Sequence, residues 1–119
     1  MATAVKRKLS ESVNGLAIKI SSTGSPGTLI HQAVSGDVAG TFDEIWLWAV
    51  NSGGQAVILT LEWGGTTVPD NVIRSNVLGA PGVVPLIPGF ILQNGLYVRA
   101  YASIADMVSV YGFVNSITD

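Results

Sequence analysis

The chain is a series of short runs in which apolar and polar residues alternate, separated by turn-forming residues. In FDEIWLWAVN, residues 42–51, Ile45, Leu47 and Ala49 share one face of an extended strand, and Trp46 and Trp48 share the other. Similar runs follow along the chain: LAIKIS (16–21), TLIHQAV (28–34), AVILTLEW (56–63), VIRSNVL (72–78), VVPLIPGFIL (83–92), LYVRAYA (96–102) and MVSVYGFVNSI (107–117). Apolar residues do not recur at helical spacing over any long stretch, so the pattern predicts an all-β protein.

The runs at 42–51 and 56–63 are separated by the glycine-rich segment SGGQ. This spacing predicts a β-hairpin between the two strands. In the second strand Val57, Leu59 and Leu61 share one face, opposite Ile58, Thr60 and Glu62, and are expected to join Ile45 and its neighbours in the core.

Turn and breaker residues refine the architecture. Pro85 and Pro88 restrict residues 83–92 to a sheet edge or an irregular extended segment, because proline donates no hydrogen bond. Asn94–Gly95 is typical of a tight type I′ turn, in which both central residues have positive φ. About eight short antiparallel strands therefore predict a single β-sandwich of jelly-roll type.

The first fifteen residues differ from the rest of the chain. They contain Lys6, Arg7 and Lys8, half of the six basic residues, followed by small and polar residues. We expect residues 1–15 to form a flexible basic arm, either solvated or ordered on a partner, and residues 16–119 to form the sandwich. The polar residues after the basic triplet do not resemble a secretory signal, so the expected site of synthesis is the cytoplasm.

Composition suggests a subunit of an assembly. The 119 residues suit one domain, cysteine is absent, and only 12% of residues are charged, against roughly 25% in average soluble domains. A chain with so few charges is expected to cover apolar surface with neighbouring subunits, as in a homo-oligomer. The longest uninterrupted apolar run, residues 45–50, is too short for a membrane span, and a net charge of −2 does not favour a nucleic-acid partner.

Trp46 and Trp48 have two interpretations. Exposed aromatic side chains on one strand face can stack on a sugar or a nucleobase, but the polar residues expected nearby, Glu44 and Glu62, are acidic and would repel phosphate. Tryptophan is also enriched at the centres of protein–protein contacts. We favour packing or an interface over a ligand platform, with a glycan site as the alternative.

A second aromatic group lies in residues 96–102. Tyr97, Arg99 and Tyr101 alternate with apolar residues and share one strand face. An arginine between two tyrosines suits cation–π contacts at an interface, and a solvated outer face is the other interpretation.

The sequence carries no recognisable catalytic motif. His31 is the only histidine, and no nucleophile motif surrounds any serine, so His31 is interpreted as a structural residue. One histidine and scattered carboxylates do not match a zinc or calcium site. The glycine-rich segments join strand to strand, whereas a phosphate-binding loop leads into a helix. We therefore expect a protein that is not an enzyme and has no cofactor or metal.

Residues 28–65, TLIHQAVSGDVAGTFDEIWLWAVNSGGQAVILTLEWGG, and residues 84–117, VPLIPGFILQNGLYVRAYASIADMVSVYGFVNSI, resemble small virion proteins encoded beside the head genes of tailed bacteriophages. The shared features are the DEIWLWAVN and LTLEWGG strands, the LQNGL turn and the closing GFVN. The resemblance covers residues 28 to 118 and brings no catalytic or ligand-binding residues with it.

The resemblance implies a capsid decoration, or cement, protein: a β-sandwich subunit, often a homotrimer, that binds the major capsid protein on the outside of the virion. The residues expected to make protein contacts are Lys6, Arg7, Lys8, Trp46, Trp48, Tyr97, Arg99 and Tyr101. The alternative is a tail, connector or fibre-associated virion protein, possibly with a glycan-binding face.

Overall fold

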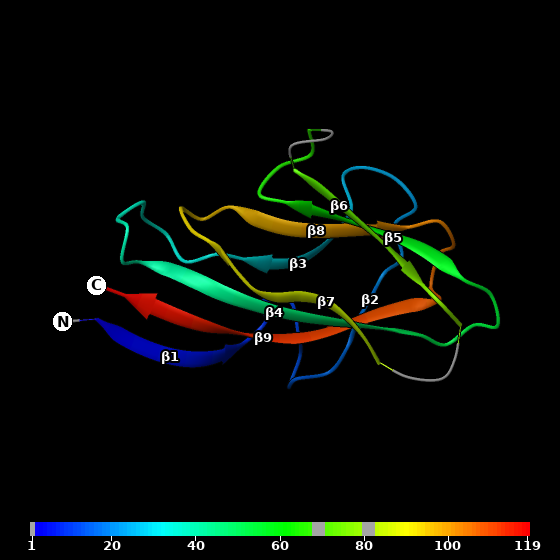
Figure 1. Ribbon diagram of the computed structural model, residues 1–119, viewed down its shortest axis with the longest axis horizontal. Helices are drawn as coiled ribbons and strands as arrows, with labels where there is room; N and C mark the ends of the chain where they lie inside the picture. Colours follow the sequence, from blue (N-terminus) through cyan, green and yellow to red (C-terminus); the bar gives the residue numbers. More distant parts are fainter. Residues whose placement is uncertain (1, 68–70, 80–82) are drawn as a thin grey trace.

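Two antiparallel sheets face each other in the computed structural model, which describes residues 2–67, 71–79 and 83–119 (Figure 1). These residues form nine strands and no helix. The strands are β1 (Thr3–Lys8), β2 (Ile18–Lys19), β3 (Thr28–Gln32), β4 (Phe42–Asn51), β5 (Val57–Trp63), β6 (Val72–Val77), β7 (Val83–Leu92), β8 (Tyr97–Ala102) and β9 (Val108–Thr118). The all-β class and the sandwich predicted from the alternation are confirmed.

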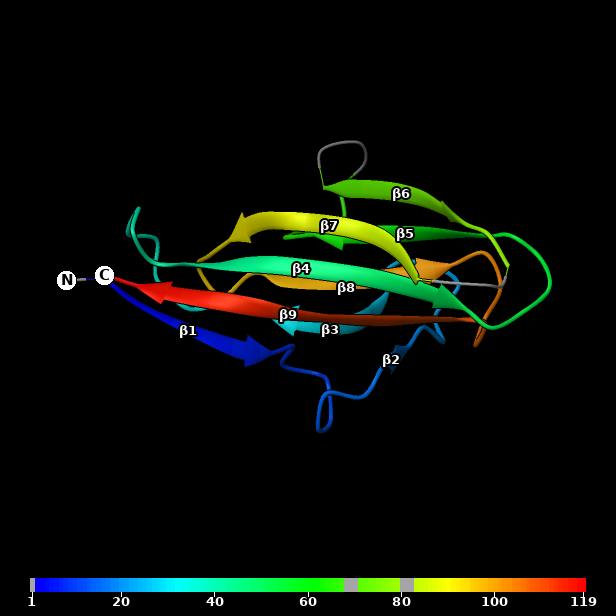
Figure 2. The same cartoon turned by 60° about the horizontal axis from the view of Figure 1, so that its bottom comes forward.

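Sheet A has the order β1-β9-β4-β7, with the short β2 also paired to β9, and sheet B has the order β3-β8-β5-β6. The pairings are nested along the chain: β5 pairs with β6, β4 with β7, β3 with β8, and β1 with β9. Figure 2 shows β1, β9, β4 and β7 side by side in one layer.

The core lies between the sheets and is formed by the strand faces that the sequence predicted. Ile45, Leu47 and Ala49 of β4 are fully buried, and β5 contributes Val57, Leu59 and Leu61. A fully buried leucine or isoleucine side chain contributes roughly 1.5–3 kcal/mol through removal of apolar surface from water. Because the side chains of a strand alternate, burial of one face of β4 places Trp46 and Trp48 on the outside of sheet A.

The predicted hairpin between residues 42–51 and 56–63 is wrong. β4 pairs with β7 and β9 in sheet A, whereas β5 pairs with β6 and β8 in sheet B. The connection between β4 and β5 passes from sheet A to sheet B. The Asn51 side chain holds it there: it donates to the carbonyls of Gln55 and Val77 and accepts from the Gly53 N–H. The apolar faces of β4 and β5 therefore oppose each other across the core.

The proline and turn predictions fare better. β7 is an edge strand of sheet A. Its register with β4 shifts twice, each time next to a proline: once between Phe90 and Pro88, and once between Ile87 and Pro85. Asn94 and Gly95 have φ of 64° and 68°, as a type I′ turn requires. The turn carries the chain from sheet A to sheet B, since β7 and β8 belong to different sheets.

The expected flexible arm is replaced by an ordered strand. Thr3–Lys8 forms β1, which pairs with β9 over six residue pairs. All six residues of β1 are exposed, so backbone hydrogen bonds to β9 and the fully buried Leu9 hold it in place. The basic residues are therefore part of sheet A.

Candidate interaction surface

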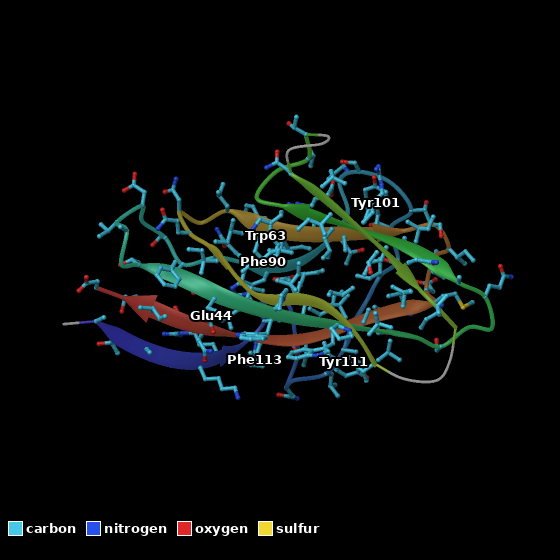
Figure 3. All side chains as sticks on the ribbon, in the orientation of Figure 1. Glu44, Trp63, Phe90, Tyr101, Tyr111 and Phe113 are labelled. Atoms are coloured by element: carbon cyan, nitrogen blue, oxygen red, sulfur yellow. The ribbon has the colours of Figure 1, made fainter. Side chains whose placement is uncertain are left out.

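The outer face of sheet A carries a cluster of aromatic side chains from β4 and β9, which we call the aromatic face: Trp46, Trp48, Tyr111 and Phe113. The rings of Trp46, Trp48 and Phe113 lie in nearly parallel planes, with centroids 5.9–6.4 Å apart. Tyr111 is opposite Trp48 in the register and is 44% exposed. Figure 3 shows Phe113 and Tyr111 beside one another along β9.

β1 brings lysine to the aromatic face. Lys6 and Lys8 are the register partners of Asn115 and Phe113, and the Lys6 ammonium lies 4.3 Å from the centroid of the Phe113 ring. This distance is typical of a cation–π contact. The structure thus places the two lysines of the basic group and both tryptophans on one surface.

Glu44 fixes one end of the cluster. Its Oε1 accepts hydrogen bonds from Trp46 Nε1 at 2.8 Å and from Asn115 Nδ2 at 3.0 Å. These hydrogen bonds, the one from Asn115 first, lower the pKa of the Glu44 carboxyl. The indole of Trp46 is therefore oriented by a carboxylate that stays ionised at neutral pH.

The β7 side of the aromatic face is apolar. Pro88 is the register partner of Trp46, and the adjacent Gly89 has a φ of 80°. A Cβ on Gly89 would lie 2.8 Å from the Trp46 indole, so only glycine lets the ring pack against this bulge. Ile91, opposite Glu44, is 56% exposed. The face thus runs from lysines on β1, across aromatic rings, to aliphatic residues on β7.

The outer face of sheet B, which we call the loop-covered face, is built differently. Tyr97, Arg99 and Tyr101 all point outward there, as predicted, and the Arg99 guanidinium lies 5.3 Å from the Tyr97 ring centroid. Arg99 also donates to the Gly27 carbonyl at 3.4 Å. No comparable contact with Tyr101 forms within the part of the chain that the structure describes.

A loop between β2 and β3 covers the centre of this face. The buried Glu62 accepts hydrogen bonds from the Ser25 hydroxyl at 2.6 Å and the Gly27 N–H at 2.7 Å. A Cβ on Gly27 would lie 2.3 Å from the Ala100 carbonyl oxygen, so glycine is needed for this approach. Glu62 was expected beside the tryptophans, and this is corrected: it lies on the opposite sheet.

His31 and Asp43 form a buried pair between the sheets. The Ser10 N–H donates to His31 Nδ1 at 2.9 Å, so Nδ1 carries no proton, and Nε2–H donates to Asp43 Oδ2 at 2.7 Å. Burial, the largest single cause, raises the pKa of Asp43, but the hydrogen bonds from His31, Ser116 and Val34 and the attraction of His31 together outweigh it and leave this pKa below its ordinary value. Both imidazole nitrogens are engaged in holding β3, β4 and the segment after β1 together, in agreement with the structural interpretation of His31.

The eight predicted contact residues therefore divide between three places. Lys6, Lys8, Trp46 and Trp48 lie on sheet A's outer face, and Tyr97, Arg99 and Tyr101 lie on sheet B's. Arg7 alternates with its lysine neighbours and points to the inner side of sheet A. Sequence reasoning missed Tyr111 and Phe113, although their alternation in residues 107–117 was a usable signal.

Comparisons of the chain with models of known protein families, with curated proteins and with solved structures found no match. None of the described residues belongs to a helix long and apolar enough to cross a membrane.

Proposed function

We propose that this chain is a structural virion protein of a tailed bacteriophage that decorates and stabilises the outside of the capsid by binding the major capsid protein. The observation that carries the proposal is the aromatic face, where three stacked, partly exposed rings and an exposed lysine lie on the outside of an ordered sheet. Aromatic residues surrounded by a polar rim are typical of protein contact surfaces.

The strand order supports a jelly roll. A chain that folds back on itself and then winds into two sheets pairs its strands in a nested way, as β5–β6, β4–β7, β3–β8 and β1–β9 do here. Jelly rolls are common among viral capsid domains. We infer that the sandwich is of this type, which fits the resemblance to virion proteins.

The charge distribution suggests how the subunit sits on a shell. Lys6 and Lys8 border the aromatic face at the β1 edge of sheet A. We propose that the aromatic face contacts the coat protein, with the lysines against an acidic patch, and that the chain assembles as a homotrimer. The lysines belong to an ordered strand, so binding costs side-chain entropy at these positions but little backbone entropy.

The first test is the copy number of the chain relative to the major coat protein in purified virions, by quantitative mass spectrometry. We expect abundance comparable to that of the coat protein. A handful of copies per particle would instead favour the alternative, a tail, connector or fibre-associated protein, and absence from the particle would refute a virion role.

The second test is binding of the purified chain to capsids that lack it. Charge reversal at the aromatic face, K6E combined with K8E, is expected to weaken binding strongly at low salt and less at high salt. The control is the single reversal Arg74→Glu at an exposed cation of β6 on sheet B, against which K6E and K8E are also compared one at a time. Equal binding by both variants would contradict the proposed orientation.

A further inference from the structure

The edge strands of the two sheets differ in how well they are protected against pairing with a further strand. An edge exposes backbone N–H and C=O groups, which proteins usually block with prolines, bulges or a covering segment. β7 contains two prolines and shifts its register with β4 twice. The segment after β1 runs along β3, where the Glu11 N–H donates to the Ile30 carbonyl and the Gln32 N–H donates to the Ser10 hydroxyl. The edges of β7 and β3 are therefore closed.

The edge of β1 is open. β1 pairs with β9 over six residue pairs without a register shift, contains no proline, and has all of its side chains exposed. No described strand pairs with its other edge, and in Figure 2 β1 lies at the border of its layer. In an antiparallel pair, alternate residues direct their N–H and C=O groups away from the neighbouring strand. The outer edge of β1 therefore offers both donors and acceptors to a further strand.

The positive charge of the chain is concentrated at this border of sheet A. β4 occupies one side of β9, so β1 and β2 lie in line on its other side. These two strands hold four of the six basic residues of the chain, Lys6, Arg7, Lys8 and Lys19, and no acidic residue, although the net charge of the chain is −2. Like charges on neighbouring strands repel, so a second copy of β1 fits poorly here. Charge complementarity points instead to an acidic partner.

We propose that the edge of β1 binds an extended acidic segment of a partner protein, which joins sheet A as an additional strand. Lys6 and Lys8 lie on the outer face of the sheet and Arg7 on the inner side, so acidic side chains on either face of the added strand meet a cation. Backbone hydrogen bonds supply affinity, and the charges select the partner. The proposal rests on the proposed function only for the identity of the partner, which is then the major capsid protein.

Other acidic partners satisfy this edge less well. The phosphates of a nucleic acid or a lipid surface attract the same cations, but phosphate oxygens only accept hydrogen bonds and leave the outward carbonyls of β1 without donors. An acidic patch on a folded surface pairs with the lysines and leaves the backbone edge unused. An extended chain alternates N–H and C=O groups at the spacing of the edge, so it satisfies the backbone as well as the charges.

The test is titration of the full chain with a peptide as long as β1, blocked at both ends, in which glutamate and valine alternate. By NMR we expect shift changes in Thr3–Lys8 and slower hydrogen exchange at alternate amides of β1, because those N–H groups become hydrogen-bonded. A peptide with lysine in place of glutamate is expected to bind about tenfold more weakly. The proposal is overturned by no binding at millimolar concentration, by equal binding of the lysine peptide, or by changes centred on β6, the edge strand of sheet B with a single basic residue.

Two N-methylated forms of the glutamate peptide separate strand addition from charge attraction. One form is methylated at every glutamate N–H and the other at every valine N–H, so the two forms carry equal charge. In an added strand only one of these sets points toward β1. We therefore expect one form to bind about tenfold more weakly than the other, because it loses backbone hydrogen bonds. Equal binding of the two forms would show that charge alone holds the peptide and would overturn the proposal.

Variants of the chain locate the site on β1. Lys8→Glu is expected to weaken peptide binding about tenfold, and Arg74→Glu, the same reversal on the edge strand β6, less than about twofold. Equal losses would contradict the site. Because the peptide contains no coat protein, a chain that binds the peptide but not capsids would refute the virion role alone, whereas a chain that binds capsids but not the peptide would refute strand addition alone.

Discussion

Glu44 on the aromatic face and Glu62 on the loop-covered face each accept two hydrogen bonds, yet only Glu62 is buried. Residues of the loop between β2 and β3 close over Glu62, whereas no described segment closes over Glu44 and the tryptophans beside it. One outer face of the sandwich is thus completed by the chain itself, and the other is left open. The loop-covered face therefore uses its buried glutamate to hold the fold, whereas the aromatic face keeps partly exposed rings available to a partner.

The largest expected effect is on stability, from removal of the two glutamates in turn. Glu62→Ala leaves the Gly27 N–H and the Ser25 hydroxyl without their acceptor in a buried space, so we expect a loss of about 3–5 kcal/mol in the free energy of unfolding. Glu44→Ala is expected to cost less than about 1 kcal/mol, because water replaces its partners. Denaturant unfolding measures both, and equal losses would remove the distinction between the faces.

The next largest effect is on binding to the capsid, where we expect a substitution on the aromatic face to matter more than one on the loop-covered face. Trp48→Ala is expected to weaken binding to the capsid by at least 2 kcal/mol, roughly thirtyfold, as for an aromatic residue at the centre of an interface. Tyr101→Ala, the matched change on the loop-covered face, is expected to change binding less than twofold. Binding affinity measured with intact folded variants tests this, and a greater loss with Tyr101→Ala would move the interface to sheet B.

Alternation in the sequence predicted which side of each strand is buried, but not which strands are neighbours. The burial of Ile45, Leu47 and Ala49 and the outward direction of Trp46 and Trp48 follow from residues 42–51 alone. The pairing partner does not, because two apolar strand faces can lie side by side in one sheet or oppose each other across a core. A short glycine-rich connection allows both arrangements, and the Asn51 hydrogen bond to the Val77 carbonyl, which holds the crossing in place, joins residues 26 positions apart in the sequence.

The sequence predicted the tryptophans of the aromatic face but not the strand that brings the lysines to it. Thr3–Lys8 has no buried face and therefore no apolar alternation, so nothing local marks it as a strand. Its structure depends on the hydrogen-bonding edge that β9 offers after folding. The contact between Lys6 and Phe113, residues from opposite ends of the chain, follows from that pairing.

A third effect concerns pH and two neighbouring carboxylates that point to opposite sides of β4. The pKa values of Asp43 and Glu44 are both lowered in the folded protein. A lowered folded-state pKa stabilises the protein above the unfolded value, about 4, and this stabilisation is lost as the pH falls through the folded-state pKa. We expect the loss of stability in acid to come mainly from the buried Asp43, because solvent screens the partly exposed Glu44.

Acid unfolding of two variants checks this expectation. Asp43→Asn should flatten the decline in stability below about pH 4, whereas Glu44→Gln should leave most of it in place. A flat profile in Glu44→Gln with an unchanged one in Asp43→Asn would show that the aromatic face, and not the interior, senses acid.

The smallest expected effect compares the cation–π contact on each face. Lys6 lies 4.3 Å from the Phe113 centroid, and Arg99 lies 5.3 Å from the Tyr97 centroid while also donating to the Gly27 carbonyl. Double-mutant cycles on the free energy of unfolding are expected to give a coupling of about 0.5–1 kcal/mol for Lys6 with Phe113 and less for Arg99 with Tyr97, since the attraction falls with distance. A larger coupling for the arginine pair would mean that the loop-covered face gains stability from its aromatic residues as well. In that case the aromatic side chains of both faces would serve the fold, and Trp48 rather than Lys6 would remain the main test of a partner.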